Sequence, residues 1–134
     1  MNIAFFLKPK SETIYISTES SVRQTLEKME HHSYTAVPII DEGGKYVGTI
    51  TEGDLLWYLK QKDFPDLFML EDASIMAVVR RVQNKSVPVH AEIEELLELA
   101  TNQNFVPVVD DQGTYIGIVT RKTILQFFYE KFKK

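Results

Sequence analysis

The chain has 134 residues, a formal net charge of −4 and no cysteine. Its 44% hydrophobic and 25% charged residues are typical of a globular protein and exclude intrinsic disorder. The lack of cysteine excludes disulfides, zinc thiolate sites and cysteine nucleophiles, and an acidic chain without a basic run is not expected to bind nucleic acid. No apolar run approaches the roughly 18 residues of a membrane span, and the N-terminus lacks the long apolar segment of a signal peptide. We therefore expect a cytoplasmic protein with no membrane and no nucleic-acid partner.

The first predicted elements are a short helical lead-in and a brief strand. Residues 3–7 form an apolar opening, and residues 76–79 repeat its character further along. Alternating apolar residues over 14–18 predict the strand, which residues 87–89 match. Each half of the chain therefore begins in the same way.

A helix is predicted next in each half. Ser21 with Gln24 fits a capping box, and apolar residues follow at helical spacing up to Met29. Over residues 92–100 the corresponding helix has carboxylates in its first turn, where the helix dipole favours them. The connection from this second helix to the next strand is shorter than in the first half.

The stretch 34–55 is the organising element, because the chain contains it twice. It reads as a strand, a tight turn, a second strand and the start of a helix. Residues 41–44 supply the Asp and Gly that a hairpin turn requires. A shift of 69 positions superposes the copies without a gap, pairing Pro38 with Pro107, Asp41 with Asp110, Gly44 with Gly113, Tyr46 with Tyr115, Gly48 with Gly117 and Thr51 with Thr120. Two copies are too few for a solenoid and predict two similar units packed as a pseudo-symmetric pair with a cleft between them.

The helices that follow the two copies are apolar on more than one side. A helix that covers one core needs a single apolar stripe. Either these helices serve a large core, or they form an interface between two copies of the chain. The apolar residues concerned are Leu55, Leu56, Trp57, Tyr58, Leu59, Ile124, Leu125, Phe127, Phe128 and Tyr129.

Residues 63–74 form the only convincing linker. Pro65 and the acidic residues break the helix, and we expect the apolar side chains of the segment to pin it to the body. These side chains are Phe64, Leu67, Phe68 and Leu70. Because the linker is short and apolar, it is no flexible tether, and the chain is expected to be one domain of two halves.

No group of residues indicates catalysis. His31 and His32 are adjacent, so on a helix they point about 100° apart and do not chelate one metal. The chain contains no Gly-x-Ser-x-Gly, Walker loop or His-Glu-x-x-His motif. We therefore predict that the protein is not an enzyme and has no catalytic residue, no metal and no cofactor.

A binding site is better supported, at the point where each second strand becomes a helix. Thr51 and Asp54 are spaced to cap the helix, and helix-start amides attract anions. A carboxylate there can also accept the hydroxyls of a ribose, so capping alone and sugar binding are both open. The second copy keeps Thr120 but has Thr123 in place of the aspartate, with Arg121 and Lys122 between them. These two cations favour a phosphate at the second element.

This twice-repeated signature, of about twenty positions, resembles the CBS domain, and two in tandem resemble a Bateman module. The resemblance implies an α/β (α+β) fold of two β-α-β-β-α repeats, 1–66 and 70–134, in one pseudo-twofold module spanning 1–134. The Thr-Arg-Lys form, with Tyr34–Pro38 and Asn104–Val106, is also similar to stand-alone CBS proteins of Gram-positive bacteria that bind cyclic di-AMP. Bateman modules pair through the helices after the motifs. This favours a homodimer through Leu55, Leu56, Leu59, Ile124, Phe127 and Phe128.

The same resemblance implies two clefts, each built from both repeats. The first is expected to consist of Thr51, Glu52, Asp54, Ser86, Val87, Asn104, Phe105 and Val106. The second is expected to consist of Thr120, Arg121, Lys122, Thr123, Ile16, Ser17, Tyr34, Thr35, Ala36 and Val37. The function implied is a non-catalytic regulatory sensor of an adenine nucleotide (AMP, ADP, ATP or cyclic di-AMP) that signals to an unknown target protein. The alternative is a structural or interaction dimer with vestigial, unoccupied clefts.

Overall fold

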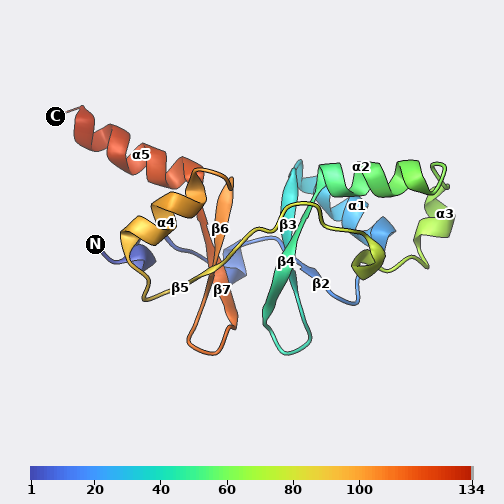
Figure 1. Ribbon diagram of the computed structural model, residues 1–134, viewed down its shortest axis with the longest axis horizontal. Helices are drawn as coiled ribbons and strands as arrows, with labels where there is room; N and C mark the ends of the chain where they lie inside the picture. The colour runs from blue at the N-terminus through green and yellow to red at the C-terminus, as the bar shows by residue number, and fades with distance from the viewer. Residues whose placement is uncertain (134) are drawn as a thin grey trace. The chain divides into compact units, whose positions relative to one another are not determined.

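The computed structural model describes residues 1–133, which form two compact units (Figure 1). One unit is the continuous segment Ile14–Gln83, named here the repeat-1 unit. The other, the repeat-2 unit, joins Met1–Thr13 to the segment from Asn84 onward. Each unit has its own sheet and its own buried core.

The repeat-1 unit has a three-stranded sheet in the order β2-β3-β4. β2 runs parallel to β3, and β3 and β4 form an antiparallel hairpin. Helices α1 and α2 and the shorter α3 accompany this sheet (Figure 1). The elements are β2 (Ile16–Ser17), α1 (Val22–His32), β3 (Ala36–Ile40), β4 (Tyr46–Thr51), α2 (Glu52–Gln61), α3 (Leu67–Leu70) and the 3-10 helix η3 (Ile75–Ala77).

The repeat-2 unit repeats this plan and adds one edge strand. Its sheet has the order β1-β7-β6-β5, with β1 antiparallel to β7 and β5 parallel to β6. The elements are η1 (Ile3–Phe6), β1 (Lys8–Pro9), η2 (Lys10–Glu12), β5 (Val87–Pro88), α4 (Ile93–Ala100), β6 (Phe105–Val109), β7 (Tyr115–Thr120) and α5 (Arg121–Phe132). The predicted β-α-β-β-α order is thus confirmed in both repeats.

The two predicted hairpins have the same turn chemistry. Asp41 accepts the amide of Lys45 at 2.9 Å, and Asp110 accepts the amide of Thr114 at 3.0 Å. Gly44 has a φ of 86°, which glycine adopts without steric cost. The predicted capping box at the start of α1 is present as well. These features are local, so the sequence pattern predicts them well.

The prolines inside the central strands lie where the sheet can accommodate them. β2 pairs only with Ile39 and Ile40, and so stops short of Pro38. β5 likewise pairs with Val108 and Val109 and stops short of Pro107. A proline cannot donate to a ladder, and in each sheet the parallel strand pairs only with residues after the proline.

Each lead-in packs in the unit of the other repeat. Ile75 and Val78 belong to the buried core of the repeat-1 unit, while Ile3 and Phe6 belong to that of the repeat-2 unit. The compact units are therefore composed differently from the repeats 1–66 and 70–134 read along the sequence.

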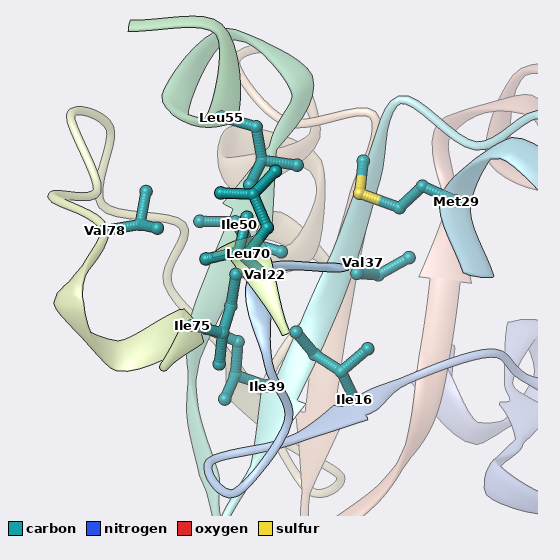
Figure 2. Packing of buried hydrophobic residues seen from close by; sticks show 10 residues of the cluster. All are labelled: Ile16, Val22, Met29, Val37, Ile39, Ile50, Leu55, Leu70, Ile75 and Val78. Carbon is teal, nitrogen blue, oxygen red and sulfur yellow. The ribbon is translucent and has the colours of Figure 1, made fainter. Parts of the chain in front are cut away.

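The core of the repeat-1 unit brings together side chains from every element of that unit (Figure 2). Leu55 on α2 is part of it, and on α5 Ile124 is buried in the corresponding core. The prediction that Leu55 and Ile124 contact a second copy is therefore wrong, because their side chains are already covered. Leu59, Phe127 and Phe128 are partly buried against the same cores. On these helices the exposed apolar side chains are Leu56, Trp57, Leu125, Tyr129 and Phe132.

The linker prediction is also partly wrong. Leu70 is buried in the core, as expected (Figure 2). Phe64, Leu67 and Phe68 are exposed instead. The apolar character of a short segment does not tell which of its side chains the backbone turns inward.

None of the helices in residues 1–133 is long and apolar enough to cross a membrane.

Candidate functional site

The strand-to-helix element of the repeat-1 unit is closed by a reciprocal cap. The Thr51 hydroxyl oxygen accepts the Asp54 amide at 3.1 Å, and the Asp54 carboxylate accepts the Thr51 amide at 3.0 Å. The predicted cap at this position is confirmed. It directs α2 away from β4 and satisfies amides that the helix itself leaves unpaired.

The other oxygen of the Asp54 carboxylate accepts the backbone amide of Arg81 at 2.9 Å. Asp54 is only 3% exposed, and each of its two carboxylate oxygens accepts a partly buried backbone amide. Trp57 lies one turn after Asp54 on α2, and the Arg81 guanidinium lies 5.7 Å from the centroid of its ring. The ribose role of Asp54 stays a prediction, and it requires this carboxylate to accept hydroxyls in addition to, or in place of, the Arg81 amide.

The corresponding element of the repeat-2 unit is more open. The Thr120 hydroxyl oxygen accepts the amide of Thr123 at 3.1 Å, and the two threonine hydroxyls are 2.8 Å apart. Thr123 and Lys122 are exposed. Arg121 donates from Nε to the carbonyl of Ala100, at the end of α4, at 2.8 Å. Arg121 therefore joins α4 to α5 in addition to supplying a cation at the start of α5.

A groove of about 570 Å³ lies beside this element within the repeat-2 unit. Its lining consists of Asn104, Thr120, Arg121, Lys122, Leu125, Gln126 and Tyr129. The repeat-1 unit has a groove of about 490 Å³ in the equivalent place, where Thr35, Glu52 and Leu56 stand for Asn104, Arg121 and Leu125. The charged side chains of this second groove are Glu30 and Glu52. The two repeats therefore offer grooves of opposite charge.

Within each unit the predicted strand residues lie beside the strand-to-helix element. Ala36 pairs with Thr51, and Phe105 pairs with Thr120. The amide of Glu52 donates to the carbonyl of Thr35 at 2.9 Å, and that of Arg121 to the carbonyl of Asn104 at 2.8 Å. The sequence-predicted residues of each repeat are thus brought together.

Side-chain exposure divides these predicted residues further. Val37, Val106, Val87 and Ile16 are buried in the cores, so a ligand can reach only their backbone. Tyr34 is exposed and stacks on His32, with ring centroids 5.6 Å apart. Of the two aromatic residues in the predicted clefts, Tyr34 is exposed and Phe105 is partly buried.

Gln103 holds the predicted residues of the repeat-2 unit in place, and sequence reasoning missed it. Its side-chain oxygen accepts the amide of Lys85 at 3.0 Å, and its side-chain nitrogen donates to the carbonyls of Lys85 and Phe105. It therefore fixes the segment leading to Ser86 and Val87 beside the start of β6. Its place in the shortened loop after α4 was the available signal.

The two predicted clefts each join residues of both units. In the first cleft, Thr51 and Asp54 belong to the repeat-1 unit and Ser86 to the repeat-2 unit. In the second cleft, Thr120 belongs to the repeat-2 unit and Ser17 to the repeat-1 unit. These groupings across the units stay predictions.

Arg80 is a second residue that sequence reasoning missed. Its Nη1 atom is buried without a hydrogen-bond partner in the described chain. The guanidinium lies over Gly48, where a Cβ atom would come within 2.1 Å of Nη1. Nearby, burial raises the pKa of Tyr46 above its ordinary value of 10.0, while a hydrogen bond from Thr49 and the charge of Arg80 oppose this shift.

Residues 1–133 contain no group of three or more His, Cys, Asp or Glu side chains placed to hold a metal ion.

A family model described as the CBS domain matches residues 7–61 and again residues 67–130. The chain belongs to the CBS domain family. The two matches correspond to the two repeats, so the protein is a CBS pair.

Among sequence relatives, the CBS pair is 31% identical over 120 residues to the inosine-5'-monophosphate dehydrogenase of Methanocaldococcus jannaschii. The aligned region covers 86% of this chain and 21% of that enzyme. The chain spans between a fifth and about half of the length of the first curated relatives that it matches.

Two solved structures show the same fold over their full length. The CbpB protein of Listeria monocytogenes in complex with c-di-AMP superposes with a TM-score of 0.85, at 19% identity, covering 98% of this chain and 97% of that one. CBSX2 in complex with AMP superposes with a TM-score of 0.74, at 24% identity, covering 99% and 98% of the two chains. The CBS pair therefore shares its architecture with proteins that bind adenine nucleotides.

Proposed function

We propose that this CBS pair is a non-catalytic regulatory sensor that binds an adenine nucleotide and signals to a target protein. The strand-to-helix elements at Thr51 and Thr120 are the proposed binding elements. The fold supports this proposal, because solved structures with the same fold contain AMP or c-di-AMP. A regulatory ligand acts by binding two states of a protein with unequal affinity.

The observation that carries the proposal is the cationic groove at the start of α5. The first turn of α5 has two cations, Arg121 and Lys122, and the amide of Thr123 is capped only by the Thr120 hydroxyl. A helix start adds a positive dipole end to these charges. We infer that this groove takes the phosphate of the ligand, and that a cyclic dinucleotide or a nucleoside polyphosphate is favoured over AMP there.

Isothermal titration of the full chain with AMP, ADP, ATP and cyclic di-AMP tests the proposal. Lys122→Ala is the informative variant, since Arg121 also holds α4 and its removal changes two things. We expect Lys122→Ala to weaken binding of a phosphorylated ligand by about tenfold, the loss of one charge-assisted hydrogen bond. Lys131→Ala, at the far end of the same helix, is the matched control and should bind as the wild type does.

Absence of heat with all four ligands would leave the alternative, a structural or interaction dimer with unoccupied clefts. That alternative has support of its own in the exposed side chains of α2 and α5. We infer a homodimer through Leu56, Trp57, Leu125 and Tyr129, which replace the buried Leu55 and Ile124. Sedimentation velocity of a Trp57→Ser variant, with and without nucleotide, separates dimer formation from ligand binding, because Trp57 is exposed and lines neither groove.

A further inference from the structure

The segment between α2 and η3 exposes four large apolar side chains. Phe64, Leu67, Phe68 and Met69 are 62%, 51%, 72% and 62% exposed, and they are named here the Phe68 surface. Scattered exposed apolar residues are ordinary on a protein surface, but a contiguous group marks an interaction site. In Figure 1 this segment lies at the end of α2, around α3.

The backbone before α3 adopts an unfavourable conformation that presents this surface. Asp63 and Phe64 have φ angles of 59° and 50°, the left-handed region that glycine favours. The amide of Phe64 donates to the carbonyl of Leu59 at 2.7 Å and ends α2. A bulky residue keeps such an angle only where the surrounding structure imposes it, and positions of this kind concentrate at functional sites.

The segment that carries the Phe68 surface is anchored to the repeat-1 unit. Leu70, the next residue, is buried in the core of the repeat-1 unit (Figure 2). Asp66 caps α3 by accepting the amide of Met69 at 2.9 Å, and Glu71 forms an ion pair with Arg23 on α1. The four apolar side chains are therefore displayed by anchored backbone.

The segment that forms the Phe68 surface carries mostly negative charge. Residues 63–72 contain four carboxylates and no lysine or arginine. Asp63, Asp66, Glu71 and Asp72 are all exposed. The preceding Lys60 and Lys62 lie over the rings of Trp57 and Tyr58 on α2. Glu71 is paired with Arg23, which leaves Asp63, Asp66 and Asp72 as the acidic rim, the name used here for these three exposed carboxylates. Acidic side chains beside exposed apolar ones are complementary to a basic, amphipathic partner.

The same charge argues against other occupants. A second copy of this chain would bring the carboxylates of Asp63, Asp66 and Asp72 against the same three, and like charges facing each other are unfavourable. A membrane surface with anionic lipids attracts basic segments and repels acidic ones. Nucleic acid requires a cationic surface.

We propose that the Phe68 surface docks a basic amphipathic helix of a partner protein. Leu67, Phe68 and Met69 receive the apolar face of that helix, and its lysines and arginines meet the carboxylates of the rim. Helices bind other proteins in this way through apolar anchors one turn apart, and methionine adapts readily to such anchors. The inference goes beyond the proposed function, because no nucleotide contact is involved.

A library of displayed helical peptides tests this proposal. Each peptide has about 16 residues, roughly four turns, with a fixed apolar stripe and the other positions varied among Lys, Arg, Asp, Glu, Ser and Gln. The immobilised target is the full chain. We expect the selected peptides to be enriched in lysine and arginine, and to bind less tightly as salt is raised.

Two variants locate the binding site. Phe68→Ser should weaken the selected peptides by at least about tenfold, as loss of a central aromatic anchor does. Phe132→Ser, at an 87% exposed phenylalanine on α5, is the matched control and should bind as the wild type does. Unchanged circular dichroism and melting temperature show that both variants are folded, which the exposure of both side chains favours.

Three outcomes overturn the proposal. Selection of acidic or neutral peptides contradicts the charge argument, and equal effects of the two serine variants contradict the location. Failure to select any peptide that binds contradicts the surface as a helix-docking site. If Phe68→Ser instead dissociates a wild-type dimer in sedimentation velocity, the occupant is a second copy of the chain and the proposal is wrong.

Discussion

The Asp54 carboxylate accepts the backbone amide of Arg81 at 2.9 Å, and so joins the start of α2 to the segment after η3. The same carboxylate caps α2 through Thr51. Asp54→Ala removes the cap and also the hydrogen bond to the Arg81 amide. We expect it to lower the free energy of unfolding by about 2.5–4 kcal/mol, from a cap worth roughly 1 and a charged hydrogen bond worth roughly 1.5–3.

Urea denaturation measures this loss, with Asp72→Ala as the control for removing an exposed carboxylate of the same unit. The control should stay within about 0.5 kcal/mol of the wild type. Equal stability of the two variants would show that Asp54 has no structural role beyond that of a surface carboxylate.

Gly48 and Gly117 are equivalent in the repeats but should respond differently to alanine. At Gly117, which has a φ of 151°, a Cβ atom would meet the backbone carbonyl of Lys8 at 2.2 Å. At Gly48 it would meet the end of the Arg80 side chain, which can move. We expect Gly117→Ala to cost on the order of 2–4 kcal/mol and Gly48→Ala about 1 kcal/mol or less.

Thermal and urea denaturation of both alanine variants test this difference. Adding Arg80→Ala to Gly48→Ala should recover the cost of the clash. A larger loss at Gly48 than at Gly117 would contradict the assignment of β1 as backbone packed against β7.

Tyr46 should make stability fall at alkaline pH. Burial raises its pKa above 10.0 in the folded protein, with partial opposition from Thr49 and Arg80. The unfolded chain therefore loses the phenolic proton first, and unfolding becomes more favourable as the pH rises above about 10. Below that pH the phenol is protonated in both states, and this contribution is fully present.

Urea denaturation at about pH 8 and about pH 11 measures the effect, since these values lie on either side of the phenol pKa. Tyr46→Phe loses the hydrogen bond with Thr49 at both pH values, so the informative quantity is the change between them. That change should be smaller in Tyr46→Phe than in the wild type and in Tyr129→Phe. An identical change in all three proteins would argue against a perturbed Tyr46.

Gln103→Ala should destabilise the repeat-2 unit. The buried side-chain amide makes three hydrogen bonds to backbone groups of Lys85 and Phe105, and alanine removes all three. We expect a loss of about 2–3 kcal/mol, measured by urea denaturation, with Gln61→Ala at the exposed end of α2 as the control. Hydrogen exchange at the Lys85 amide should accelerate in Gln103→Ala. Unchanged exchange would show that Gln103 does not hold this segment.

Local chemistry made part of the molecule predictable from its sequence. The hairpins depend on Asp and Gly at fixed offsets, and the caps at Ser21 and Thr51 on a hydroxyl three residues before its amide. These features depend on residues only a few positions apart, so the sequence predicts them without knowledge of the tertiary fold. The repeats and the order of their elements followed from the same signals.

The direction of individual side chains and the pairing of residues far apart in the sequence could not be predicted in the same way. When Leu55 and Leu56 are both apolar, periodicity does not decide which one faces the core, and the same holds for Phe68 and Leu70. Gln103 bonds to backbone groups of Lys85, 18 positions away in the sequence, which only the folded chain brings beside it. The sequence also did not predict that each lead-in packs in the unit of the other repeat, which is called here the exchange of lead-ins. An apolar segment has the same pattern whichever unit it packs against.

The exchange of lead-ins sets the order in which the two units can fold during synthesis. The repeat-1 unit is one continuous segment, so all of its core has been made once Gln83 has left the ribosome. The repeat-2 unit is different, because β1 near the start of the chain pairs with β7 near its end, Lys8 lying opposite Ile118. β1 is translated before β7, so it stays without this strand partner until β7 has been made.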